Sequence, residues 1–228
     1  MISVKPRFKY IDRKKSDLLV LVPGWASDWR IFRHLDLEFN YLLPLEFSPF
    51  SFEQTLLETL QKNSFKKISL FGWSLGGFLA AEFASKYPDC VEKLILTSVR
   101  KRYSSKELKQ TRTSLKRNRQ DCLHKFYNLC FAKGEDSSWF RQNLLSDYSK
   151  GLKTDYLLEG LDYFKNAQLD PASLNRTTKI QIIHGEDDAI APIDEVKEIK
   201  DKLPQAEFIA FKKTGHIPFL KKDLNRYL

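Results

Sequence analysis

Short apolar runs separated by polar and glycine-containing turns recur along this chain. Continuous apolar stretches of six to eight residues predict strands that are buried on both faces of a sheet. The expected strands are residues 17–23, 40–47, 67–72, 92–99, 179–185 and 206–211. Between them, the spacing of apolar positions predicts helices over residues 52–61, 75–87 and 193–202, with Leu56, Leu57 and Leu60 on the inward side of the first.

Strands that alternate with helices predict an α/β fold, with a mainly parallel sheet covered by helices on both faces. Residues 101–168 differ, because they are polar, basic and helical, with aromatic residues at intervals. A chain of 228 residues suits one core. We therefore expect a single domain over residues 1–228, with residues 101–168 inserted above the sheet as a helical basic lid, called the lid segment below.

A glycine-rich turn joins the predicted strand 67–72 to the helix that follows it. Gly72-Trp73-Ser74-Leu75-Gly76 has the G-x-S-x-G spacing of a nucleophile elbow, in the strand-turn-helix context that this motif requires. The tight turn strains the serine backbone and presents its hydroxyl at the positive end of a helix. Ser74 is therefore the candidate nucleophile.

A serine hydroxyl needs a base, an orienting acid and donors for the oxyanion. In this fold the acid and then the histidine follow the serine along the chain. Asp188 follows one predicted strand and His216 follows the next, so they are the candidate acid and base. Asp188 is preferred over Asp187 and Glu186 because its spacing to Pro192 suits the expected turn.

The oxyanion hole should use two backbone N–H groups, from Leu75 directly after the nucleophile and from Trp25 after the first buried strand. The side chain of Trp25 has two interpretations: it lines the acyl pocket, or it is a surface aromatic packed on Trp29. The other histidines are assigned elsewhere. We expect His34 in a helix with a structural role, His184 in packing or a turn, and His124 facing solvent or a partner.

These motifs resemble the α/β-hydrolase superfamily across nearly the whole chain. Within it, the chain is similar to the pimeloyl-[acyl-carrier protein] methyl ester esterases of biotin synthesis. The resemblance implies hydrolysis of the methyl ester of a pimeloyl chain on acyl carrier protein, with basic lid residues that hold the acidic carrier. One departure is Pro23, where the family usually has histidine. The segments that carry the resemblance are 22–25, 72–77, 158–164 before 169–170, 188–192 and 215–219.

The net charge of +9 lies in one part of the chain. Residues 100–133 hold eleven Lys and Arg but only two acids, Glu107 and Asp121, so the remainder is neutral. A local field of this kind attracts an acidic partner. If Leu108, Leu115, Cys122 and Phe126 form one helical apolar stripe, then Lys109, Arg112, Lys116 and Arg119 form a basic stripe beside it. We expect Arg112, Lys116 and Arg119 to contact the carrier. A merely solvated helix is the alternative, and a nucleic-acid site is disfavoured because no binding motif is present.

The composition restricts the remaining possibilities. No apolar run is long enough to span a membrane, and no apolar signal segment begins the chain. The three cysteines form no CxxC pair, which disfavours a zinc site or a disulfide framework and favours a reducing compartment. We expect a cytoplasmic protein that needs no metal or organic cofactor.

The sequence thus predicts a serine carboxylesterase acting on pimeloyl-acyl-carrier-protein methyl ester. Two alternatives stay open. One is a broad esterase, thioesterase or C–C hydrolase for small acyl compounds. The other is an inactive hydrolase fold that binds a carrier, which the intact order of Ser74, Asp188 and His216 disfavours.

Overall fold

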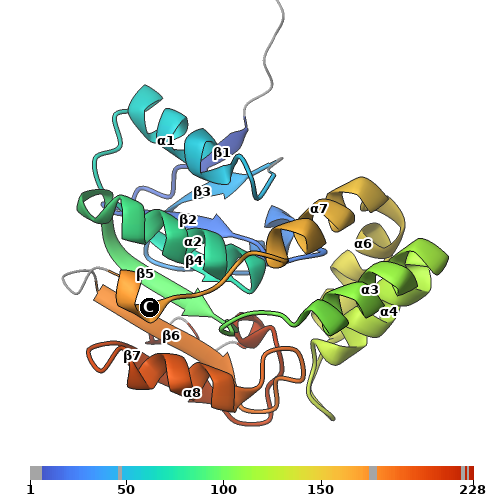
Figure 1. The fold of residues 1–228 in the computed structure, drawn as a ribbon. Helices are drawn as coiled ribbons and strands as arrows, with labels where there is room; N and C mark the ends of the chain where they lie inside the picture. The colour runs from blue at the N-terminus through green and yellow to red at the C-terminus, as the bar shows by residue number, and fades with distance from the viewer. Residues whose placement is uncertain (1–6, 46–47, 175–178, 222–223, 225) are drawn as a thin grey trace, which may run out of the picture.

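A seven-stranded sheet forms the centre of the computed structural model, which describes residues 7–45, 48–174, 179–221, 224 and 226–228. The strand order is β1-β3-β2-β4-β5-β6-β7 (Figure 1), and β1 and β3 are the antiparallel pair in an otherwise parallel sheet. This confirms the predicted α/β class. The strands are β1 (Phe8–Ile11), β2 (Leu18–Val22), β3 (Asn40–Pro44), β4 (Ile68–Trp73), β5 (Val91–Thr97), β6 (Lys179–Gly185) and β7 (Glu207–Phe211).

Six of these strands coincide with the predicted apolar runs. Every residue of β2 and β4 is buried, as expected for central strands of a sheet covered on both faces. β1 is the strand that the sequence pattern did not predict. It buries Phe8 but exposes Lys9 and Tyr10, because it lies at the edge of the sheet. Residues 46–47 of the predicted strand 40–47, and residues 1–6, lie outside the described part.

Helices α1 (Phe52–Lys62), α2 (Leu75–Lys86) and α8 (Ile193–Asp201) agree with the predicted helices. In α1 the buried side chains include Leu56 and Leu60, whereas Leu57 is only half-buried. Short 3-10 turns link the elements. They are η1 (Trp29–Phe32), η2 (Pro88–Cys90), η4 (Pro171–Ser173) and η5 (Pro218–Leu220).

The lid segment is helical, and its helices gather beyond the carboxyl ends of the parallel strands (Figure 1). Leu108 and Leu115 are buried on α3 and Cys122 on α4, but these two helices are separated by Asn118. The expectation of one continuous apolar stripe is therefore wrong, because the Asn118 side chain caps a new helix. The helices are α3 (Ser105–Arg117), α4 (Arg119–Leu129), α5 (Ser138–Phe140), the π-helical η3 (Arg141–Leu145), α6 (Ser146–Gly151) and α7 (Thr154–Phe164).

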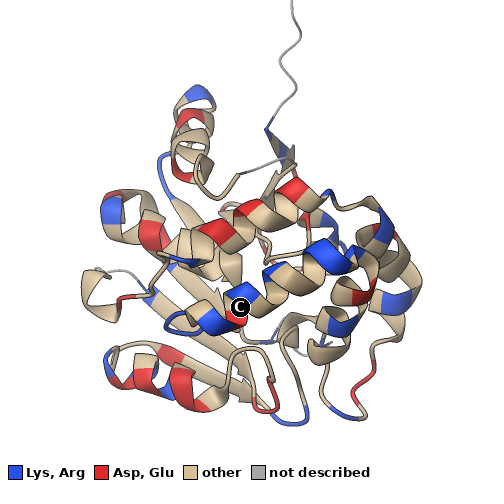
Figure 2. Cartoon of the chain, turned by 45° about the vertical axis from the view of Figure 1, so that its right-hand side comes forward, with Lys and Arg blue, Asp and Glu red and all other residues tan. Residues whose placement is uncertain are grey.

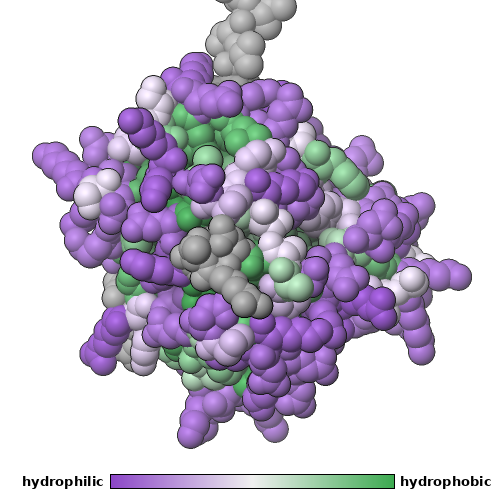
Figure 3. Space-filling view, turned by 60° about the vertical axis from the view of Figure 1, so that its left-hand side comes forward, coloured by the Kyte–Doolittle hydropathy of each residue, from purple (hydrophilic) through white to green (hydrophobic). Residues whose placement is uncertain are grey.

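Charged side chains cover much of the outer surface. The face shown in Figure 3 is mostly hydrophilic, with apolar side chains exposed in separate areas. Basic residues are frequent on the lid helices, and acidic residues of the same segment lie next to them (Figure 2). The concentration of positive charge seen in residues 100–133 is therefore partly balanced in space by neighbouring carboxylates.

Candidate active site

Ser74 occupies the turn between β4 and α2. Its backbone has φ 53° and ψ −113°, in a region that non-glycine residues rarely adopt. The Ser74 N–H donates to the Thr97 carbonyl at 2.9 Å, which anchors this strained turn to the neighbouring strand. A Cβ on Gly72 would lie 2.3 Å from the Gly76 carbonyl oxygen, and one on Gly76 would lie 2.1 Å from the Val22 oxygen. The two glycines are therefore required by close backbone packing around the serine.

Asp188 and His216 meet at the carboxyl end of the sheet. The Nδ1 atom of His216 lies 2.8 Å from Oδ2 of Asp188, and neither side chain is accessible to solvent. The other carboxylate oxygen of Asp188 accepts the N–H groups of Ile190 and Ala191, each at 2.9 Å. Because a carboxylate only accepts, Nδ1 carries the imidazole proton and Nε2 has a free lone pair.

Burial opposes the charge on Asp188, but its neighbours stabilise that charge. Burial raises the pKa of Asp188, whereas His216, His184 and the Ala191 N–H lower it more, so the pKa lies below its usual value. Asp188 is therefore a carboxylate at neutral pH. Asp187 and Glu186, the two alternatives from the sequence, are exposed.

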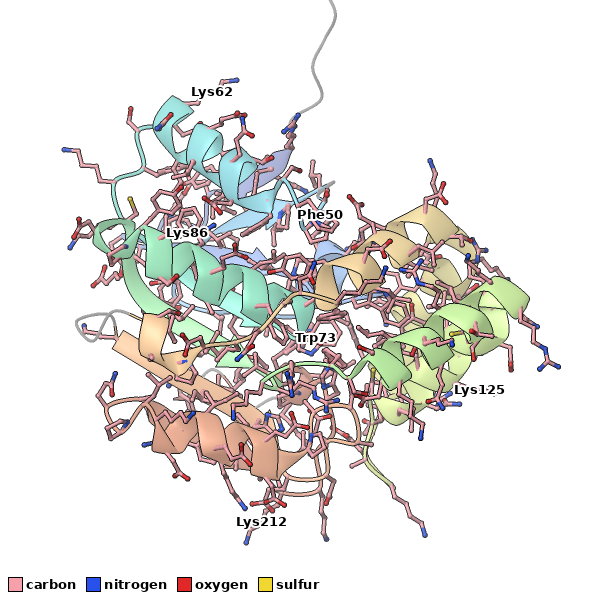
Figure 4. The ribbon with its side chains drawn as sticks, viewed as in Figure 1. Phe50, Lys62, Trp73, Lys86, Lys125 and Lys212 are labelled. Atoms are coloured by element: carbon pink, nitrogen blue, oxygen red, sulfur yellow. The ribbon has the colours of Figure 1, made fainter. Side chains whose placement is uncertain are left out.

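The main chain of His216 is held from two sides. Its N–H donates to the Cys130 carbonyl at 2.8 Å, and its carbonyl accepts from Nε1 of Trp73 at 2.7 Å. The imidazole also contacts the Trp73 ring, at 5.7 Å between centroids. Figure 4 places Trp73 between the sheet and the lid helices. Within the described residues, Nε2 of His216 makes no hydrogen bond, so this atom is available to a hydroxyl.

The other histidines do not share the Asp188–His216 hydrogen bond, although Nε2 of His184 lies 3.6 Å from Oδ2 of Asp188. His34 is in a turn after η1, so the predicted helix is wrong there, but its Nε2 contacts the Phe219 carbonyl at 3.0 Å in a packing role. His184 is buried at the end of β6 and contacts the Ala191 carbonyl at 2.8 Å. Burial lowers the pKa of both residues, which keeps them neutral at pH 7. His124 is exposed on α4, as one of its two interpretations allowed.

A cavity of about 240 Å³ opens beside Ser74 under the lid helices. Trp25 forms part of its wall: the indole is buried, donates from Nε1 to the Leu157 carbonyl at 2.8 Å, and packs edge-on against Phe126 at 4.8 Å. The Trp29 ring instead lies under Lys9 and Arg33. The interpretation of Trp25 as a pocket residue is therefore the one that the contacts favour. Besides Trp25 and Phe126, the apolar lining includes Leu108, Leu129, Leu161, Phe164, Ala189 and Ile190, and the polar lining comprises Ser74, Arg100, Tyr103, Glu107, Gln110 and Thr111.

The two residues predicted to form the oxyanion hole lie in segments that adjoin Ser74. Leu75 is the first residue of α2, where N–H groups have no partner within the helix. A Cβ on Gly24 would lie 3.1 Å from the Ser74 Cβ, so the Gly24–Trp25 chain passes directly beside the nucleophile. The assignment of Leu75 and Trp25 to an oxyanion hole stays a prediction, and this arrangement is compatible with it.

Tyr103 is a site residue that sequence reasoning missed. It lines the same cavity, and its hydroxyl interacts with the Ser74 side chain. The Arg100 guanidinium lies over its ring at 4.8 Å, and the Phe164 ring is 4.4 Å away. Burial raises the pKa of Tyr103, so its hydroxyl stays protonated and neutral. Tyr103 belongs to no recognised motif, and only the fold brings it to Ser74.

The three lid cations expected to contact a partner have different surroundings. Arg112 pairs with Asp162 at 2.5 Å. Arg119 donates to the carbonyl oxygens of Leu152 at 2.7 Å and Lys150 at 2.9 Å, so it joins two parts of the lid segment. Lys116 is exposed. Of the three, Lys116 is thus the one whose charge is directed to solvent, whereas the two arginines also stabilise the lid segment.

This combination of fold and site defines an α/β hydrolase. The model of the Hydrolase_4 family, described as serine aminopeptidase, S33, matches residues 52–223, and the chain belongs to this family. Solved structures agree on the fold. A bromoperoxidase from Bacillus anthracis superimposes with a TM-score of 0.82 at 18% identity, covering 96% of this chain and 92% of that one. An esterase from Exiguobacterium antarcticum gives 0.81 at 16% identity, covering 96% and 92%.

Curated relatives include several proteins named pimeloyl-[acyl-carrier protein] methyl ester esterase. The one from Nitrosomonas europaea is 29% identical over 169 residues, which are 68% of this chain and 66% of that protein. The match to the Nitrosospira multiformis protein spans 61% of its length. The one from Wigglesworthia glossinidia brevipalpis is 25% identical over 245 residues, covering 95% of this chain and 93% of the relative.

The described residues contain neither a membrane-spanning helix nor a cluster of metal-binding side chains. None of the helices there has the length and apolar character needed to cross a membrane. Nor does that part of the chain bring three or more His, Cys, Asp or Glu side chains together in a group that could hold a metal ion.

Proposed function

We propose that this protein is a serine carboxylesterase in which Ser74, His216 and Asp188 act as nucleophile, base and orienting acid. The observation that carries the proposal is the 2.8 Å contact between Asp188 and His216 at the same end of the sheet as the strained elbow of Ser74. In this arrangement Nε2 of His216 is the atom that removes the serine proton.

The reaction follows from these positions. Ser74 Oγ attacks the ester carbonyl while Nε2 of His216 takes its proton, and the carbonyl oxygen becomes an oxyanion held by the N–H groups of Trp25 and Leu75. Collapse of the intermediate returns the proton to the leaving alcohol and leaves an acyl-enzyme. Water, activated by the same histidine, then releases the acid. Asp188 holds the imidazole tautomer and stabilises the imidazolium in both halves of the cycle.

The substrate that we favour is the methyl ester of pimeloyl-acyl-carrier protein. The names of the relatives support this choice, and so does the apolar cavity beside Ser74, which suits a chain of methylene groups. The carrier would be an acidic partner attracted by the basic lid segment. Of the three lid cations expected to contact it, Lys116 is the best placed, because Arg112 and Arg119 are engaged within the chain.

An assay with three substrates tests this function. Purified protein is given the methyl ester of pimeloyl-acyl-carrier protein, free methyl pimelate and a short p-nitrophenyl ester, with Ser74→Ala as the matched control. We expect the highest kcat/KM on the carrier-linked ester and almost no turnover by the variant. Equal kcat/KM on carrier-linked and free esters would favour the broad esterase. Binding of carrier without turnover of any ester would favour the inactive binding module.

A further inference from the structure

The chain that follows α4 is fastened to the loop that carries His216. Besides the bond from the His216 N–H to the Cys130 carbonyl, Oε2 of Glu135 accepts the N–H of Gly215 at 2.8 Å. The two segments also pack closely, since a Cβ on Gly215 would lie 2.5 Å from the Cys130 oxygen. Two consecutive backbone N–H groups, those of residues 215 and 216, are therefore bound by one short stretch of the lid segment.

A tight turn holds the Glu135 carboxylate in place. Its N–H donates to the Ala132 carbonyl at 3.0 Å, and its Oε2 accepts the Ala132 N–H at 2.7 Å. Gly134 between them has φ 79°, a conformation that glycine adopts without strain. The same carboxylate oxygen thus links its own turn to Gly215. A carboxylate that is already fixed loses little freedom when it makes the second bond.

We infer that Glu135 is a positioning residue for His216, through the hydrogen bond from its carboxylate to the Gly215 N–H. This inference rests on the proposed role of His216 as base. Gly215 has no side chain, so the backbone directly before His216 is positioned by its main-chain packing against Cys130 and by this hydrogen bond. Displacement of a reacting group by about 1 Å can lower a rate about 100-fold. A fixed loop keeps Nε2 within reach of Ser74 and Nδ1 on Asp188.

Three variants separate the effect of the accepting oxygen of Glu135 from the effect of the size of its side chain. Glu135→Ala removes the acceptor and leaves two backbone N–H groups without it. Glu135→Gln keeps an oxygen that accepts both. Lys133→Ala, an exposed change in the same turn, is the control. With a short p-nitrophenyl ester, we expect kcat of the alanine variant to fall about 10- to 100-fold while KM changes less than about twofold. The glutamine and Lys133 variants should stay within a few-fold of the wild type.

A spectroscopic signal reports on the base itself. The proton shared by His216 Nδ1 and Asp188 should give a downfield proton resonance. Glu135→Ala should shift or broaden this resonance, while Glu135→Gln preserves it. If Glu135→Ala only destabilised the fold, the melting temperature would fall, but kcat and the resonance of the folded protein would stay the same as in Glu135→Gln. If Glu135→Ala keeps wild-type kcat and an unchanged resonance, or if Glu135→Gln fails as badly as alanine, the positioning role is wrong. The proposed function fails separately, if Ser74→Ala keeps its activity.

Discussion

Replacing Asp188 by asparagine is the most informative single change, because the surrounding hydrogen bonds fix how the new side chain must lie. Oδ1 of Asp188 accepts two backbone N–H groups, from Ile190 and Ala191, each at 2.9 Å. An asparagine keeps both bonds only if its oxygen takes this position. The opposite orientation would leave both donors unpaired, and the loss of a buried partner, as for Ala191, costs about 1–3 kcal/mol. The amide NH₂ therefore faces His216.

An NH₂ group in that position reverses the tautomer of the imidazole. Nδ1 of His216 would have to accept, so the ring proton moves to Nε2, and Nε2 can no longer take the proton of Ser74. We expect kcat to fall by up to ~10⁴. At 1.36 kcal/mol for each factor of ten, this is about 5.4 kcal/mol of lost transition-state stabilisation. KM for a small ester should change little, because Asp188 does not line the cavity.

The measurement compares Asp188→Asn with Asp187→Asn on a short p-nitrophenyl ester. Asp187 is exposed, and it is its backbone N–H that bonds to the Thr214 carbonyl, at 3.0 Å, so its amide variant should keep nearly full activity. Thermal unfolding of both variants checks that the fold is intact. An Asp188→Asn enzyme within tenfold of wild type, or an Asp187→Asn enzyme that is the more damaged of the two, would refute the tautomer argument.

Three further changes test the elbow and the lid. Ser74→Ala should leave a folded protein with ester hydrolysis reduced by ~10³–10⁶, measured as kcat, and near-full activity would contradict its role. Gly76→Ala should lower stability by about 3 kcal/mol or more, because its Cβ would lie 2.1 Å from a carbonyl oxygen; Gly151→Ala, with nothing within 4 Å, should be neutral in the same thermal melt. Lys116→Glu should raise KM for the carrier-linked ester and not for a small neutral ester, and high salt should have the same effect on wild type. A proportional loss on both esters would exclude Lys116 from carrier docking.

The sequence was sufficient to predict the strands and helices whose apolar pattern reflects burial. The central strands are buried on both faces, so each appears as a continuous apolar run. The edge strand β1 was not predicted, because only Phe8 of its four residues is buried and the strand therefore has no continuous apolar run. The division of the lid stripe at Asn118 was missed for another reason. The hydrophobic spacing continues across it, while the start of the new helix is marked by a capping bond, which the Asp121 N–H donates to the Asn118 side chain.

The candidate site residues also fall into two groups, those that the sequence indicates and those that only the structure reveals. Ser74, Asp188 and His216 could be chosen as candidates because motifs and strand ends mark them, and the structure places Asp188 against His216. Tyr103 and Glu135 carry no such mark. The Glu135 carboxylate reaches Gly215 across 80 positions of sequence, a contact that only the folded lid segment creates. A motif identifies the groups that react, but the groups that hold them in place come from packing.

The lid segment therefore has two faces with different expected effects. The charges on its outer face, represented by exposed Lys116, should govern the encounter with a carrier and hence KM. Its inner face supplies Tyr103 beside Ser74, and Cys130 and Glu135 behind His216, so changes there should appear in kcat. A lid that only covered the cavity would show no such division. Exchange of the whole segment for another lid would then change binding and chemistry together, whereas single substitutions on one face should separate them.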